Sequence, residues 1–119
     1  MTLSNDKPQV LDLEEALERV GEDMEIFREI TELFLETYPD QLEEIRKGID
    51  DRNADKVERA SHSLKGSVGA LAAKKAHETA FRLEVIGREG RLEEAPEEYS
   101  RLEQALKELD TALKEIISE

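Results

Sequence analysis

A histidine and two glycines share one short stretch of this sequence, and their spacing could support nucleophilic chemistry. His62 is followed by Gly66 and Gly69, and at 3.6 residues per turn the three positions fall on one stripe of a helix, which Ala73 would extend. The apolar residues of the stretch fall on the opposite face, so the imidazole is expected to point to solvent. A neutral, exposed imidazole keeps a free lone pair on one ring nitrogen and can act as a nucleophile.

The two glycines require an explanation, because glycine inside a helix costs about 1 kcal/mol relative to alanine. One explanation is an approach lane, defined here as the surface over Gly66 and Gly69, that lets a second macromolecule bring a reacting group up to the ring. Lys65 would add a positive charge within reach of that ring. The alternative is that the glycines serve close helix packing and that His62 is an ordinary surface residue. The spacing alone leaves both interpretations open.

The residues around the histidine resemble a known signature. The run His62-Ser63-Leu64-Lys65-Gly66 is similar to the H-x-L-K-G motif of histidine-containing phosphotransfer (HPt) domains, the relay modules of two-component phosphorelays. The resemblance extends over most of the chain. It includes Glu58-Arg59-Ala60 before the histidine, Leu83-Glu84 and Gly87-Arg88-Glu89-Gly90 after it, and a long amphipathic segment at the end. Ala72 stands where many members have a glycine.

This resemblance implies a function and a role for each residue. A receiver domain would supply an aspartyl phosphate and a bound Mg²⁺, and His62 would accept the phosphoryl group and pass it to another receiver domain. Lys65 would stabilise the charge of the phosphoryl group, and Gly66 and Gly69 would form the approach lane. The implied partners are response-regulator receiver domains and a hybrid sensor histidine kinase.

Other functions remain open from the residues alone. The chain could be an adaptor that binds a receiver or kinase domain without phosphotransfer, or a structural bundle with an incidental histidine. The sequence has no phosphate-binding Gly-x-x-x-x-Gly-Lys run, so we expect a transfer intermediate and no kinase activity. A metal site built on His62 and His77 alone would be short of ligands, and His77 is interpreted as an ordinary exposed histidine.

Composition and charge narrow the class of partner. The 119 residues carry a net charge of −13 and include no cysteine, which suits a small domain of the reducing cytoplasm and argues against nucleic acid as a partner. The charge is uneven, because residues 51–75 hold six basic and three acidic side chains. His62 therefore lies in a basic segment that could attract a phosphoryl group. No apolar run reaches the ~18 residues of a membrane span, so we expect no membrane insertion.

The composition also predicts an all-α protein, because Glu, Leu, Ala and Lys are abundant while Gly and Pro are few. Apolar stripes predict an antiparallel up-down four-helix bundle with a short extra N-terminal helix, acting as a monomer. The expected elements are a lead or linker over 1–9 and a bundle domain over 10–119, with helices over 11–20, 23–47, 54–71 and 74–88, a turn over 48–53, and a last helix that Pro96 opens.

Individual residues are expected to shape these helices. Pro39 removes one backbone hydrogen bond and should kink the long helix in the turn before it. Asn53 or Asp51 should cap the histidine helix. Gly87 and Gly90 are expected to end the helix that follows, by the usual role of glycine past a helix terminus.

The long helix carries more apolar residues than one core stripe needs. Ile26 and Leu33 lie to one side of that stripe. We expect the short first helix to cover them, and the alternative is that they belong to a surface that binds a receiver domain. The core stripe itself consists of Phe27, Ile30, Phe34, Tyr38, Leu42 and Ile45.

Overall fold

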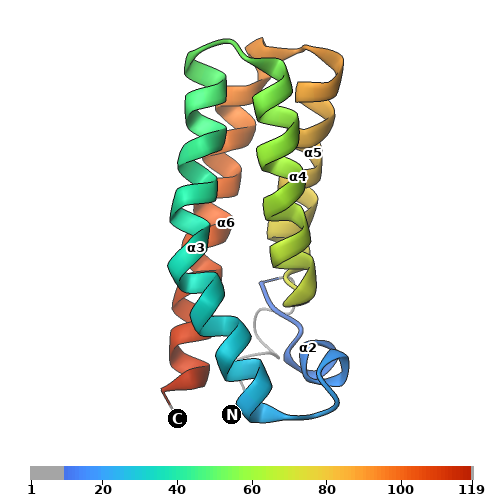
Figure 1. The fold of residues 1–119 in the computed structure, drawn as a ribbon, viewed down its shortest axis with the longest axis vertical. Coiled ribbons are helices and arrows are strands. Elements are labelled where there is room, and N and C mark those ends of the chain that lie inside the picture. The colour runs from blue at the N-terminus through green and yellow to red at the C-terminus, as the bar shows by residue number, and fades with distance from the viewer. Residues whose placement is uncertain (1–9, 119) are drawn as a thin grey trace.

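The computed structural model describes residues 10–118 and consists of helices joined by short connections (Figure 1). Consecutive long helices run in opposite directions, so the predicted antiparallel up-down four-helix bundle with a short extra N-terminal helix is confirmed. The predicted lead over residues 1–9 lies outside the described residues. The helices are α2 (Leu13–Arg19), α3 (Met24–Asp50), α4 (Ala54–Ala70), α5 (Lys74–Glu89) and α6 (Ala95–Ile117), with a 3₁₀ turn η1 (Leu92–Glu94) before α6.

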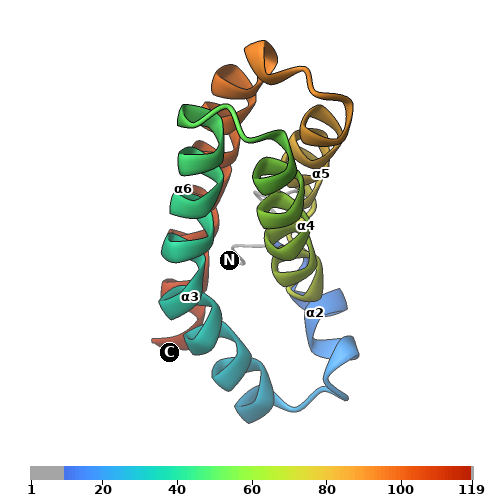
Figure 2. The ribbon, with the colours of Figure 1, turned by 45° about the horizontal axis from the view of Figure 1, so that its top comes forward.

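The four long helices enclose one core. Figure 2 shows α4 beside α5, and their contact is the most extensive in the bundle, followed by that between α3 and α4, whereas the contact between α3 and α6 is smaller. The core is almost entirely aliphatic, as the small number of aromatic residues requires. Fully buried members from all four helices include Phe27, Ile45, Val57, Leu64, Val68, Leu83, Leu102, Leu106, Leu109 and Leu113.

Side-chain caps begin three of the helices. Asp12, Asp23 and Asn53 each accept a hydrogen bond from a backbone N–H in the first turn of α2, α3 and α4, which satisfies donors that have no partner within the helix. Asn53 is therefore the cap of the histidine helix. Asp51 is instead the C-terminal cap of α3.

Two glycines that were expected to terminate helices lie inside them. Gly48, predicted to open the turn over 48–53, is a buried residue of α3, and a Cβ atom there would lie 2.9 Å from a methyl group of Val57. Gly87 is a buried residue of α5 in contact with the backbone of α4. Both predictions were wrong for the same reason, because each glycine allows close helix packing. Gly90 does end α5, with a left-handed φ of 73°.

Pro39 is accommodated within a continuous α3. The ribbon of α3 changes direction partway along its length (Figure 1), in keeping with the predicted kink. Next to the proline, the Tyr38 hydroxyl donates a hydrogen bond to Asp110 of α6, and its ring stacks on Phe34 at a centroid distance of 5.0 Å. The hydrogen bond joins α3 to α6 at this point, and the part of α3 before the bend leads toward α2 (Figure 1).

The short helix α2 packs across the end of the α4–α5 pair (Figure 1). The Arg19 guanidinium donates a hydrogen bond to the carbonyl of Gly69, and the backbone N–H of Asp12 donates to the carbonyl of Ala72. Because α2 is held there, it does not cover the flank of α3. Ile26 and Leu33 are 42% and 61% exposed, so the prediction that α2 covers them was wrong.

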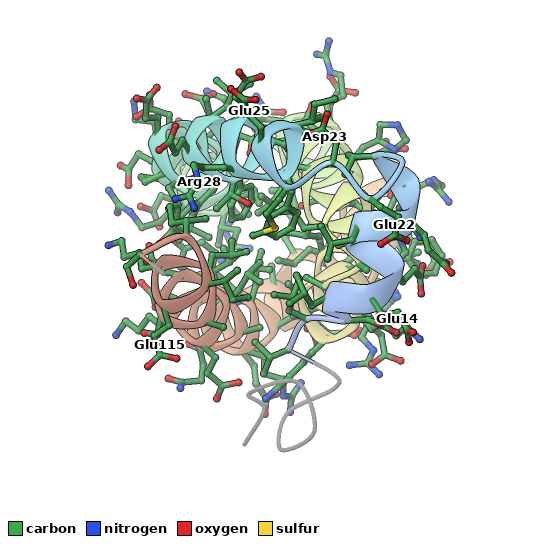
Figure 3. The ribbon with its side chains drawn as sticks, turned by 90° about the horizontal axis from the view of Figure 1, so that it is seen from below. Glu14, Glu22, Asp23, Glu25, Arg28 and Glu115 are labelled. Atoms are coloured by element: carbon green, nitrogen blue, oxygen red, sulfur yellow. The ribbon has the colours of Figure 1, made fainter. Side chains whose placement is uncertain are left out.

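Charged side chains cover the outside of the bundle. Figure 3 looks at the end where α2, the start of α3 and the end of α6 meet, and apolar side chains fill the space between the helices. Arg28 donates a hydrogen bond from α3 to the carbonyl of Ile117 in α6. Among the described helices, none combines the length and apolar character that crossing a membrane requires. Carboxylates that point outward at this end include Glu14, Glu22, Asp23, Glu25 and Glu115.

Candidate functional site

His62 lies near the middle of α4, with 67% of its side chain exposed. The opposite face of α4 is buried, as the apolar pattern predicted. That face consists of Val57, Ser61, Leu64, Val68 and Leu71, with Ala60 half-buried. The helix therefore presents the imidazole to solvent on a rigid, well-packed element.

The imidazole is held by a buried carboxylate from the neighbouring helix. Nδ1 of His62 lies 3.0 Å from Oε2 of Glu84 on α5, whose side chain is only 6% exposed. An ionised carboxylate can only accept hydrogen bonds, so Nδ1 must be the nitrogen that carries the proton. In the neutral ring the lone pair is then on Nε2, the outer nitrogen, which is the nucleophilic position.

Glu84 is surrounded by positive charge. Its Oε1 lies 2.8 Å from the ammonium of Lys65, and its Oε2 lies 2.8 Å from the guanidinium of Arg88, which also pairs with Glu58 at 3.1 Å. Burial raises the pKa of the Glu84 carboxyl, but the hydrogen bonds and charges of Lys65 and His62 outweigh it and hold the pKa below its usual range. The carboxyl is therefore ionised near neutral pH and able to accept from the ring.

The Lys65 ammonium already has two partners within the domain. Its side chain is 21% exposed, and its ammonium lies 5.1 Å from the centroid of the Phe81 ring as well as beside Glu84. The positive charge of Lys65 is thus near His62, as expected, but it is paired with Glu84, the same carboxylate that contacts the ring. The predicted contact between Lys65 and a phosphoryl group stays a prediction.

The approach lane is open at one of its two glycines. A Cβ atom on Gly66 would meet no atom within 4 Å, whereas one on Gly69 would lie 3.2 Å from the ring of His77. The expected opening at Gly69 is therefore corrected: His77 of α5, exposed as predicted, occupies that space. Ala73 does not extend the stripe, because it lies beyond α4 as the buried first residue before α5.

Sequence reasoning did not assign a role to Glu84, Arg88 or Phe81. The sequence does contain a pattern that could have identified Glu84 as a site residue. Glu84 falls on the buried face of α5, next to Leu83 and one turn from Ala80 and Gly87. A carboxylate on a buried face must have partners, and here they are His62 and the two cations.

Comparisons with known proteins identify the family and the fold. The sequence matches the family model described as the Hpt domain over residues 29–112. No curated protein matches the sequence at a significant level. The solved structures include the HPt domain from the Hpt sensor hybrid histidine kinase of Shewanella, at a TM-score of 0.81 and 16% identity, with 92% of this chain and 95% of that chain covered. At this identity the likeness shows a shared fold.

The match to the family model covers well over half of the chain. It includes the histidine and the carboxylate that holds it, and the solved HPt domain has the same bundle. The protein therefore belongs to the Hpt domain family, whose members carry phosphoryl groups on histidine in two-component phosphorelays and interact with receiver or kinase domains.

Proposed function

We propose that this Hpt domain accepts a phosphoryl group on Nε2 of His62 from the aspartyl phosphate of a receiver domain and passes it to a second receiver domain. The observation that carries the proposal is the 3.0 Å contact between Nδ1 of His62 and Oε2 of Glu84. It favours the tautomer in which the exposed nitrogen is unprotonated, so no separate base is required to activate the ring.

The transfer step balances without an added proton. The Nε2 lone pair forms a bond to phosphorus while the bond from phosphorus to the receiver's aspartate oxygen breaks, and the aspartate leaves as a carboxylate. The ring keeps its Nδ1 proton and becomes cationic as the new bond forms. Ionised Glu84 lies against that proton and stabilises the developing charge. Transfer to the next receiver reverses the same step.

Cations of this domain and of the receiver would neutralise the negative charge of the phosphoryl group and of the leaving carboxylate. Lys65 would contact the phosphoryl oxygens when a receiver is docked, moving only a short way from Glu84. Arg88 would keep Glu84 paired during that movement. We place Mg²⁺ on the receiver, where it would neutralise the leaving carboxylate.

The surface around the histidine suits a protein partner. Gly66 leaves the space beside His62 open. On the α3 flank Leu33 is 61% exposed, and on the α5 flank Phe81 is 44% exposed. We propose these two exposed apolar side chains as contacts of the receiver domain. The proposed carrier works as a monomer in the cytoplasm, with receiver domains and a hybrid histidine kinase as partners.

One experiment separates the carrier from its alternatives. A receiver domain labelled with acetyl phosphate is mixed with the chain, and both binding and acid-labile phosphate on the chain are measured. A carrier gains the label. An adaptor that works without phosphotransfer binds the receiver and gains none, and a purely structural bundle neither binds nor gains label.

A further inference from the structure

The helices α4 and α5 approach each other closely at Gly87. A Cβ atom there would lie 2.6 Å from the backbone nitrogen of Glu58, 2.9 Å from the carbonyl oxygen of Ala54 and 3.0 Å from the Cα of Glu58. These are backbone atoms of a helix, so no rotation of a side chain can make room. Any larger residue at position 87 must push the two helices apart.

This contact lies one helical turn from the histidine site on both helices. Glu84 precedes Gly87 by three residues on α5, and His62 follows Glu58 by four residues on α4. Because the two helices are antiparallel, both side chains lie on the same side of the contact and face each other. The separation of the helices at Gly87 therefore sets the gap that Glu84 must span to reach the ring.

Glu84 has little freedom to follow a displaced helix. Its side chain is buried, Oε1 pairs with Lys65, and Oε2 is shared by His62 at 3.0 Å and Arg88 at 2.8 Å. Arg88 moves with Glu84, because both are on α5. A displacement of about 0.5–1 Å would lengthen the contact with His62 beyond hydrogen-bond distance.

We propose that Gly87 is a positioning residue for His62. Its missing side chain sets the α4–α5 separation at which Glu84 holds the Nδ1 proton and leaves Nε2 free. The expected effect of Gly87 on the rate of phosphorylation rests on the proposed function of His62. Its expected effect on the tautomer of the His62 ring does not.

The test compares Gly87→Ala with Gly48→Ala as a matched control. Gly48 is also a buried glycine at a helix contact, but it faces Val57 across the α3–α4 seam. The state of the ring is read from the ¹⁵N chemical shifts of His62, which distinguish the Nδ1–H from the Nε2–H tautomer. Reactivity is read with phosphoramidate, a small donor whose P–N bond breaks to release ammonia as the new bond to Nε2 forms, so no partner protein is involved.

Gly87→Ala should shift the ring away from the Nδ1–H tautomer and slow labelling about tenfold, the lower end of what losing the orienting partner of a histidine costs in metal sites. Gly48→Ala should keep the wild-type tautomer and rate. In a Glu84→Ala background, which has no acceptor for the Nδ1 proton, Gly87→Ala should cause no further loss, because both changes act through one hydrogen bond. A wild-type tautomer in Gly87→Ala, or an equal loss in Gly48→Ala, would overturn the proposal.

A second variant tests the same spacing if Gly87→Ala does not fold. Glu84→Asp shortens the side chain by one methylene and leaves the helix contact unchanged. It should lose the Nδ1–H tautomer. Retention of that tautomer would overturn the proposal, because it would show that the contact with His62 does not depend on the exact separation of α4 and α5. A wild-type ring in the Nδ1–H form that takes no phosphate from any donor would instead refute the proposed function and leave the positioning role standing.

Discussion

Replacing Gly66 should make the protein more stable and less able to exchange phosphate with its partner. Gly66 is an exposed residue in the interior of α4, and a Cβ atom there would contact nothing within 4 Å. Gly66→Gln therefore adds helix propensity without a packing cost. The gain should be somewhat under ~1 kcal/mol, which corresponds to a rise in Tm of about 2–4 °C for a domain of this size.

Phosphotransfer from a receiver should respond in the opposite direction. The new side chain projects beside His62 into the space that the active site of the receiver must enter. Displacement of the reacting groups by about 1 Å can cost on the order of 100-fold in rate. Gly66→Ala gives a matched control, because it has at least the same gain in helix propensity but adds only a methyl group. Its rate should lie between wild type and Gly66→Gln.

The assay pairs thermal unfolding with two phosphate donors. Transfer from a labelled receiver should fall sharply in Gly66→Gln, while labelling by phosphoramidate, which needs little space, should stay near the wild-type rate. A variant that melts well below wild type would show that Gly66 is a packing contact. A variant that is stable and fully active with the receiver would show that no partner approaches over Gly66. Either result would rule out an open approach to His62 over Gly66.

Further predictions follow from the charges and the exposed apolar surface. Lys65→Ala should slow transfer from a receiver by at least several-fold. It should also lower the free energy of unfolding by about 1 kcal/mol or more, because it removes a partner of buried Glu84. An unchanged transfer rate would show that Lys65 only supports Glu84. Because the pKa of Glu84 is lowered in the folded protein, its contribution to stability is present above the usual carboxyl value of 4.5 and is lost as the pH falls through the folded value. Wild type should therefore lose more stability than Glu84→Gln when circular dichroism melts are compared at pH 6 and at successively lower values below 4.5, and parallel losses would contradict the assignment. Leu33→Ser should weaken binding of a receiver domain about tenfold and leave Tm almost unchanged, because Leu33 is 61% exposed; unchanged affinity in a titration would place the docking surface elsewhere.

The helices and their buried faces were predictable from the sequence because periodicity records them directly. The stripe through Val57, Leu64 and Val68 is apolar, and the structure buries it. The outward position of His62 follows from the same pattern. Asn53 was recognisable as a cap, because its side chain has a local role that depends only on the first turn of α4.

The partners of each helix were harder to predict, because register between helices is not a local property. Glu84 lies 22 residues from His62 in sequence, and only the antiparallel alignment of α4 and α5 brings the two together. His77 reaches Gly69 for the same reason. The sequence shows that these residues exist, but not which turn of one helix faces which turn of the other.

Glycine was the residue most often misinterpreted. Gly48, Gly87 and Gly90 all lie near helix ends, and only Gly90 has a left-handed backbone that terminates a helix. The other two are needed for close contact between helices. A single sequence does not distinguish a glycine that ends a helix from one that allows close contact between helices, because both roles depend on the missing side chain.

We expect Nε2 of His62 to carry the phosphoryl group. The most direct measurement maps acid-labile phosphate after incubation with a phosphorylated receiver domain, in wild type, His62→Gln and His77→Gln, and identifies the phosphorylated nitrogen by NMR. Label is expected on Nε2 of His62 in wild type and in His77→Gln, and none in His62→Gln. Label that persists in His62→Gln, or a phosphoryl group on Nδ1 of His62, would contradict it.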